Sequence, residues 1–247
     1  MAAEGEDEGS RTGALSAKIV LAAAGLLEDQ GLDAMSVRAV ASRAGVFPPT
    51  IFRLFGDKDG LLEAVGEYGF ETYLRAKSGL PRSDDPVADL RAAWDLHVRF
   101  GLMQPAYYGL VFGHVRSVGL SRAGREAVSE LRRMVARVGA LGHLRMSVER
   151  AAAMMHAGGV GVVMTLLDSS TRDLAVSEAT REAVLAAIVR PPAEGGYTDL
   201  SGAGPAGPAM ALRAALDTTE ATVLSPGEGL LLRELLDRLA DAPSGTG

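Results

Sequence analysis

Four cationic side chains fall within one short stretch of the sequence, where their charge could bind phosphate groups. Residues 34–58 hold one acid, Asp57, and four cations, so the local charge is 4 − 1 = +3. The cations are Arg38, Arg43, Arg53 and Lys58. The whole chain carries −6 at pH 7, but salt screens exposed charges that lie more than about 10 Å apart. A basic patch on an acidic protein can therefore still bind nucleic-acid phosphates.

The local sequence predicts that these cations lie on two short helices joined by a tight turn. Val40 and Ala41 belong to an apolar face at helical spacing. Ser36 can cap the first helix through its hydroxyl, and Gly45 can end that helix in the left-handed conformation. Pro48 suits the first turn of the second helix, where its missing N–H is not needed. This is a helix-turn-helix, whose second helix enters the DNA major groove.

Three polar side chains of this stretch could contact DNA directly. Thr50 and Arg53 lie on the second predicted helix, and arginine can pair bidentately with guanine. Lys58 begins the next predicted helix, where free N–H groups and the helix dipole already favour a phosphate. The alternative for each is a solvated surface role. We expect Arg53 to contact bases and Lys58 to contact the DNA backbone.

The motifs around this stretch resemble the tetracycline-repressor (TetR) family of bacterial transcription regulators. Residues 16–65 show, in the family's order, an apolar helix closing at Gly31, the AxxAGV turn, the helix T-I-F-R-L-F, and D-K-D-G-L-L. The resemblance implies an all-α fold, with a three-helix helix-turn-helix DNA-binding domain followed by a larger helical ligand-binding and dimerisation domain. It also implies a set of residues at the DNA face: Ser36, Arg38, Phe47, Pro48, Thr50, Phe52, Arg53 and Lys58.

Two residues depart from the family's pattern. Phe47 stands where a small capping residue is usual, which removes an N-cap usually worth about 1 kcal/mol. Its ring is expected either near the DNA face or folded back as a hydrophobic staple. Phe52 stands where tyrosine is usual, so the phosphate hydrogen bond of that hydroxyl is lost. Both changes bear on the strength and the sequence preference of DNA binding.

The composition favours a helical protein in two parts. Apolar residues make up 47% of the 247 residues, and no stretch alternates apolar and polar residues. We expect a disordered acidic tail at residues 1–13, the helix-turn-helix domain at 14–80, and a helical effector-binding and dimerisation domain at 81–247. Because the acidic start lacks an apolar core and the chain lacks cysteine, we expect a cytoplasmic location and no disulfide.

The second domain is predicted to be a series of helices. The expected helices cover about 87–104, a segment from Pro105, a segment from Ser121, 151–167, 177–189, about 210–216, and a last one capped by Ser225 with Pro226 at its first position. Residues 190–209 are rich in glycine and proline and predict an exposed loop.

Residues 151–167 contain no charged side chain. The run is shorter than the roughly 20 residues of a membrane helix, so we expect a helix buried on all sides and no membrane contact. Together with 177–189 it is predicted to pair with its twofold copy as a four-helix bundle in a homodimer. Gly158, Gly159 and Gly161 would allow close approach of the partner.

Bulky side chains on these helices could bind an apolar molecule. Any one of them is more simply a core residue, but a set that combines methionines with aromatics is typical of apolar pockets. His97, Tyr107, His156 and Thr165 could orient such a molecule by hydrogen bonds. The predicted ligand-binding residues are Trp94, His97, Phe100, Met103, Tyr107, Tyr108, Phe112, Met154, Met155 and Met164.

Three functions remain open on the sequence alone. The first is a homodimeric repressor that binds a palindromic DNA operator and is released by an apolar small-molecule effector. The second is a DNA-binding regulator without such a ligand, controlled by a protein partner. The third is a helical carrier or enzyme. The chain contains no G-x-S-x-G, H-E-x-x-H or G-x-x-x-x-G-K-[ST] motif, and its histidines lack metal-ligand spacing, so we expect no catalytic residue, metal or cofactor.

Overall fold

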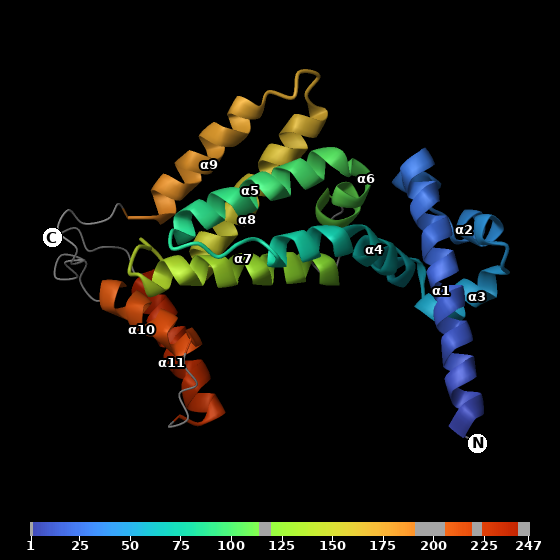
Figure 1. Cartoon of the computed structure of the whole chain (residues 1–247), viewed down its shortest axis with the longest axis horizontal. Coiled ribbons are helices and arrows are strands. Elements are labelled where there is room, and N and C mark those ends of the chain that lie inside the picture. The colour runs from blue at the N-terminus through green and yellow to red at the C-terminus, as the bar shows by residue number, and fades with distance from the viewer. Residues whose placement is uncertain (1, 114–119, 191–205, 219–223, 242–247) are drawn as a thin grey trace. The chain divides into compact units, whose positions relative to one another are not determined.

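A computed structural model of the chain describes residues 2–113, 120–190, 206–218 and 224–241 (Figure 1). Within these ranges the regular secondary structure is helical, apart from one isolated antiparallel β-bridge between Leu144 and Val189. The predicted all-α fold is therefore confirmed.

The helices gather into two compact units. The first contains Met1–Ala76 and Phe100–Ala127, and the second contains Lys77–Arg99 and Val128–Gly247. The chain therefore passes from one unit to the other more than once. The single boundary predicted near residue 80, which divides the chain by function, stays a prediction.

The first unit begins with the helices of the helix-turn-helix. They are α1 (Ala2–Gln30), the short 3-10 helix η1 (Leu32–Ala34), α2 (Val37–Ala44), α3 (Pro48–Phe55) and α4 (Lys58–Ser78). The first helix begins at Ala2 and so includes most of the segment 1–13, for which disorder stays a prediction. Alanine and glutamate, which are frequent in this segment, are good helix formers, and no proline interrupts it.

The turns form as predicted, at a capping serine and at glycines that end helices. The Ser36 hydroxyl accepts a hydrogen bond from the Ala39 N–H at 3.1 Å and caps α2. Gly45 ends that helix with φ 65° and ψ 40°, and Gly31 follows α1 with φ 77°. Both angles are in the region that glycine occupies at little steric cost. Helix α1 packs on α2, with Ile19 and Val40 fully buried between the helices of this unit.

Two short segments and the start of a longer helix complete the first unit. Helix α6 (Pro105–Tyr108) begins at the predicted proline but continues as a π-helical segment, η2 (Gly109–Gly113). Helix α7 (Arg122–Ala140) follows Ser121, as predicted, and the Ser121 hydroxyl caps it by accepting a hydrogen bond from the Gly124 N–H at 3.1 Å. Arg122 pairs with Glu67 of α4, which joins the start of α7 to this unit.

The second unit contains most of α5 (Pro86–Met103) and of α7, together with four whole helices. These are α8 (Val148–Asp168), α9 (Leu174–Ile188), α10 (Ala206–Thr218) and α11 (Pro226–Ala240). Helices α8 and α9 pack side by side as a hairpin, and α10 and α11 form another (Figure 1).

The starts of the last helices only partly match the predictions. Helix α9 begins three residues before Ser177, because Asp173 accepts a hydrogen bond from the Ala175 N–H at 3.0 Å and caps it. The capping box of Ser225 and Glu228 before α11 is confirmed. Helix α10 begins at Ala206, inside the predicted loop, while residues 191–205 lie outside the described part of the chain.

Helix α8 is buried on one side only. Ala151, Met155, Gly159 and Val163 face the interior, whereas Gly161 and other small residues of the opposite face are exposed. The expectation of a helix buried on all sides is therefore wrong for the single chain. Among the described helices, α8 alone is long and apolar enough to span a membrane, a weak indication because core helices of soluble proteins have the same length and composition.

Candidate functional site

The predicted DNA-contacting residues lie on the outer surface of the helix-turn-helix. Ser36, Arg38, Arg53 and Lys58 are exposed, and Pro48 and Thr50 are half-buried. Phe47 is the N-cap of α3 and makes no side-chain capping bond. Its ring is 82% exposed, which excludes the hydrophobic-staple alternative, and Phe52 is 50% exposed. Two aromatic rings of the motif are therefore exposed, as are the cations Arg38, Arg53 and Lys58.

Three of the four cations in this stretch are available to a ligand. Within the described residues, Arg38, Arg53 and Lys58 form no ion pair with an acid. Arg43 is different, because its Nη2 lies 2.7 Å from Oδ2 of Asp29 on α1. A Cβ on Gly25 would lie 2.8 Å from the same nitrogen, so the absence of a side chain there lets Arg43 rest on α1. The sequence count of +3 therefore overstates the charge offered to a phosphate.

One further cation, which was not among the predicted DNA-contacting residues, lies near the turn. Lys18 of α1 is exposed, and its Nζ lies 4.0 Å from the position of a Cβ on Gly45. The periodicity of α1 identifies Ile19 as buried, which places Lys18 on the outside. It does not show that this part of the outside adjoins the α2–α3 turn, because that depends on how α1 packs against α2.

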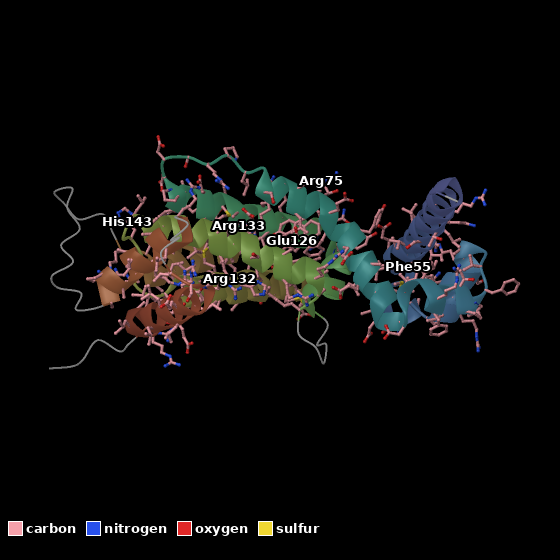
Figure 2. The ribbon with its side chains drawn as sticks, turned by 90° about the horizontal axis from the view of Figure 1, so that it is seen from below. Phe55, Arg75, Glu126, Arg132, Arg133 and His143 are labelled. Carbon is pink, nitrogen blue, oxygen red and sulfur yellow. The ribbon has the colours of Figure 1, made fainter. Side chains whose placement is uncertain are left out.

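The start of α4 is fixed by the end of α3. The Asp57 carboxylate accepts a hydrogen bond from the Gly60 N–H at 2.8 Å and so caps α4. A Cβ on Gly60 would lie 2.0 Å from the backbone oxygen of Phe55, the residue labelled near this junction in Figure 2. Only glycine allows the two helices to meet so closely. This contact sets the position of Lys58 relative to the second helix of the motif.

The predicted ligand-binding residues form separate groups. In the first unit, Phe100, Tyr108 and Phe112 join two aromatics of α4, Phe70 and Tyr73, in one cluster. Neighbouring rings have centroids 4.7 to 5.5 Å apart. The two α4 residues were not among the predicted ligand-binding residues, because α4 falls within the predicted helix-turn-helix domain at 14–80. Their spacing of three on one helix was the available signal.

Tyr107 lies in the same unit but has a different environment. Its ring lies over Gly69 of α4, where a Cβ would come within 2.1 Å of the ring. Its hydroxyl donates a hydrogen bond to Oε1 of Glu28 on α1 at 2.6 Å. Burial, followed by this hydrogen bond, raises the pKa of Tyr107. Tyr107 therefore connects α6, α4 and α1 within the first unit.

In the second unit, Trp94 and His97 pack on the glycines of α8. A Cβ on Gly158 would lie 3.1 Å from the Trp94 ring, and one on Gly159 would lie 3.2 Å from the His97 ring. The Trp94 indole N–H donates to the Ser177 hydroxyl at 3.0 Å. Two of the three glycines predicted for the subunit interface thus serve packing within the chain.

The charges of Lys77 and His156 act on the buried side chain of His97. Burial, together with the charge of Lys77 and a smaller effect of His156, lowers the pKa of His97 to about 3. Burial likewise lowers the pKa of Lys77 to about 8, although Glu130 opposes the shift. His97 is therefore a neutral imidazole at pH 7. Lys77 was not singled out in the sequence, because its place at the end of α4 gave no sign of burial.

The four methionines predicted to bind a ligand, three on α8 and one on α5, differ in how far they are exposed. Met155 is buried, Met154 is half-buried, and Met103 and Met164 are 69% and 41% exposed. The structure therefore does not gather the predicted set into one lining, and a ligand-binding role for these residues stays a prediction.

Comparisons with known proteins address the family and the fold. Residues 19–65 match the family model of bacterial regulatory proteins of the tetR family. No curated protein matches the sequence. A structure from Shewanella sp. PV-4, assigned to the tetR family of transcription regulators, has a TM-score of 0.58 and 19% identity over 72% of this chain and 99% of that chain.

Two further structures are similar. A bacterial regulatory protein of the tetR family from Rhodococcus RHA1 has a TM-score of 0.54 and 19% identity, covering 70% of this chain and 96% of that chain. The multidrug binding protein EbrR, complexed with imidazole, has a TM-score of 0.54 and 20% identity, covering 71% and 90%. At such identities the likeness concerns the fold, and the family is carried by the matched helix-turn-helix segment. Residues 19–65 therefore match the tetR family of bacterial regulatory proteins, and the chain shares its fold with structures assigned to that family.

Proposed function

We propose that the protein is a homodimeric repressor that binds a palindromic operator and is released by an apolar small molecule. The observation that carries the proposal is the exposed helix-turn-helix surface, where Arg38, Arg53 and Lys58 have no acidic partner among the described residues. Such a protein acts in the cytoplasm, needs no cofactor, and performs no catalysis. The fold of a DNA-binding regulator is common to the similar structures.

The DNA contacts can be tested by selecting duplexes from a random library with the protein. We expect the selected sequences to be inverted repeats, because a twofold dimer presents two recognition helices. In anisotropy titrations, Lys58→Ala should weaken binding to all sequences and lower the salt slope by about one unit. Arg53→Ala should instead relax the preference at one base position. Arg132→Ala, an exposed arginine of α7, serves as the control. Wild-type binding by both test variants would refute this docking.

The proposed dimer surface is the exposed face of the α8–α9 hairpin. On α8 the exposed residues Ala153, Ala157 and Gly161 recur four apart, and on α9 Val176 and Ala183 are exposed. Small residues at this spacing allow another helix to approach closely. The apolar character of both faces supports pairing with a twofold copy as a four-helix bundle.

Gly161 offers a sharp test of this surface. No atom lies within 4 Å of a Cβ built there, whereas Gly159 contacts His97. Gly161→Leu should therefore leave the single chain folded but weaken the dimer, while Gly159→Leu should lower the melting temperature itself. Sedimentation or light scattering measures the first effect and circular dichroism the second. A folded wild-type monomer at micromolar concentration would contradict the proposal.

The effector is proposed to be apolar and to bind against aromatic side chains of the helical core. The imidazole complex of EbrR supports a small-molecule site in a protein of this fold, and five aromatic rings cluster in the first unit. Effector binding would change the spacing of the two recognition helices through α4. Hydrophobic compounds should then lower operator affinity and change the emission of Trp94, the only tryptophan. Reciprocity requires that DNA lower effector affinity equally.

One observation favours the alternative of a regulator controlled by a protein partner. Leu231, Leu235 and Leu239 of α11 recur four apart and are 57%, 44% and 43% exposed. An apolar stripe of this kind is a common docking surface for another helix. If the leucines were changed to glutamine, regulation by a partner would be lost while operator binding by the purified protein stayed intact. If hydrophobic compounds alone released the protein from its operator, this alternative would be excluded.

A further inference from the structure

The second unit contains a cavity of about 620 Å³ among the start of α5, the segment between α7 and α8, and the end of α9. None of the residues predicted to bind the effector lines it. Its volume is within the range of small-molecule sites, which is about 300 to 1,000 Å³. Apolar side chains, among them Val87, Leu141 and Leu185, form part of its wall.

A short backbone pairing holds the polar part of this wall in place. The Arg145 N–H donates to the Ile188 oxygen at 2.9 Å, and the Arg190 N–H donates to the His143 oxygen at 2.8 Å. These bonds flank the antiparallel bridge between Leu144 and Val189. They bring His143, labelled after the end of α7 in Figure 2, opposite Arg190, and both residues line the cavity with Arg145.

Two of the three acids that line the cavity already have partners within the chain. Glu182 accepts hydrogen bonds from Arg91 at 2.9 to 3.2 Å and from Arg181 at 2.9 Å. The hydrogen bonds from Arg91 are the largest reason why the pKa of Glu182 falls to about 2. Asp85 caps α5, since its Oδ1 accepts the N–H groups of Val87 and Ala88 at 2.9 and 3.0 Å. These carboxylates have little capacity left for a ligand.

The polar groups of the cavity wall that a ligand could still contact are mainly hydrogen-bond donors. Arg145 uses Nε for the Val189 oxygen at 3.0 Å, which leaves its two terminal amino groups. The Arg190 guanidinium has no side-chain partner within the described residues. Against these stands one acid, Asp84, which is exposed at the rim. Planar arginine groups are suited to bidentate binding of a carboxylate.

We propose that this cavity binds a small amphipathic acid, with its carboxylate on Arg145 and Arg190 and its apolar body against Val87, Leu141 and Leu185. The inference goes beyond the proposed repressor function. It concerns a second ligand site with a different charge requirement from that of the apolar effector, and it does not depend on operator binding.

The test uses the full-length protein and three probes of equal chain length: octanoate, octan-1-ol and octylamine. Isothermal titration calorimetry should show saturable binding of octanoate, with both other probes at least about tenfold weaker, as expected when a charge-assisted pair is lost. Arg190→Ala should weaken octanoate binding about tenfold. Arg132→Ala, which removes an exposed arginine outside the cavity, should leave it unchanged.

A second variant acts in the opposite direction. Among the acids that line the cavity, Asp84 alone has no partner within the described residues. Asp84→Asn removes its charge, so octanoate should bind more tightly to this variant than to the wild type. Circular dichroism confirms that each variant is folded. Equal binding of octan-1-ol and octanoate, wild-type affinity in Arg190→Ala, equal weakening in Arg132→Ala, or no saturable binding at millimolar octanoate would each overturn the proposal. Loss of operator binding would leave it unaffected.

Discussion

The hydrogen bond between Tyr107 and Glu28 gives a quantitative prediction about the first unit. It joins residues 79 positions apart in the sequence, with the hydroxyl 2.6 Å from the carboxylate oxygen. Tyr107→Phe removes the hydroxyl and leaves the ring on Gly69, where the close packing is unchanged. The substitution therefore tests the hydrogen bond without opening a cavity.

The expected loss follows from the charge and the exposure of the two groups. A hydrogen bond to a charged group contributes about 1.5 to 3 kcal/mol. Tyr107 is 3% exposed, but Glu28 is exposed and can be hydrated once the hydroxyl is gone. We therefore expect the lower end, a loss of about 1.5 kcal/mol in the free energy of unfolding. For a chain of this size that corresponds to a melting temperature lower by about 3 to 6 °C.

Urea unfolding followed by circular dichroism measures this difference. Tyr68→Phe is the matched control, because that side chain lies on α4 with its ring 6.4 Å from Tyr107 and is 45% exposed. It should change stability by less than about 0.5 kcal/mol. In a double-mutant cycle with Glu28→Ala, the interaction energy between the two residues should account for most of the stability lost in Tyr107→Phe. If Tyr107→Phe is as stable as Tyr68→Phe, the connection between α6 and α1 contributes nothing.

Three other predictions concern the helix junction and the acid range. Gly60→Ala, which would place a Cβ 2.0 Å from the Phe55 oxygen, should lower both the melting temperature and operator affinity; unchanged melting would contradict the junction. The pKa of His97 in the folded protein is lowered to about 3. The free energy of unfolding should therefore fall as the pH drops from about 6.5 to 3, by up to about 1.4 kcal/mol per pH unit. Urea titrations of His97→Gln should show a smaller fall over the same pH range. Glu182, with its pKa lowered to about 2, should contribute stability above pH 4.5 that disappears between about 4.5 and 2; Glu182→Gln should lack this step.

The helix-turn-helix could be predicted from sequence because its signals are local. A serine cap, a left-handed glycine and a proline in the first helical turn act within a few residues of one another. The structure has Ser36, Gly45 and Pro48 in these roles. The cap at Asp57 is of the same kind. None of them requires knowledge of the tertiary packing.

Side-chain partners distant in sequence could not be predicted in this way. Trp94 donates to Ser177, which is 83 positions away, and Arg43 pairs with Asp29 on another helix. Helical spacing identifies which face of a helix is apolar, but it does not identify the opposing side chain. Trp94 and Tyr107 were therefore predicted to contact a ligand, whereas each already has a hydrogen-bond partner within its unit.

These intrachain bonds restrict how an apolar effector can bind. An apolar molecule that displaced the Ser177 hydroxyl from Trp94 would leave a buried indole N–H unsatisfied, at a cost of about 1 to 3 kcal/mol. Contact with the half-buried rings of Phe100 and Phe112 removes no hydrogen bond, because phenylalanine has no polar group. The effector is thus expected against these two rings. Phe112→Ala should weaken its binding, whereas Ser177→Ala should lower stability and leave effector affinity unchanged.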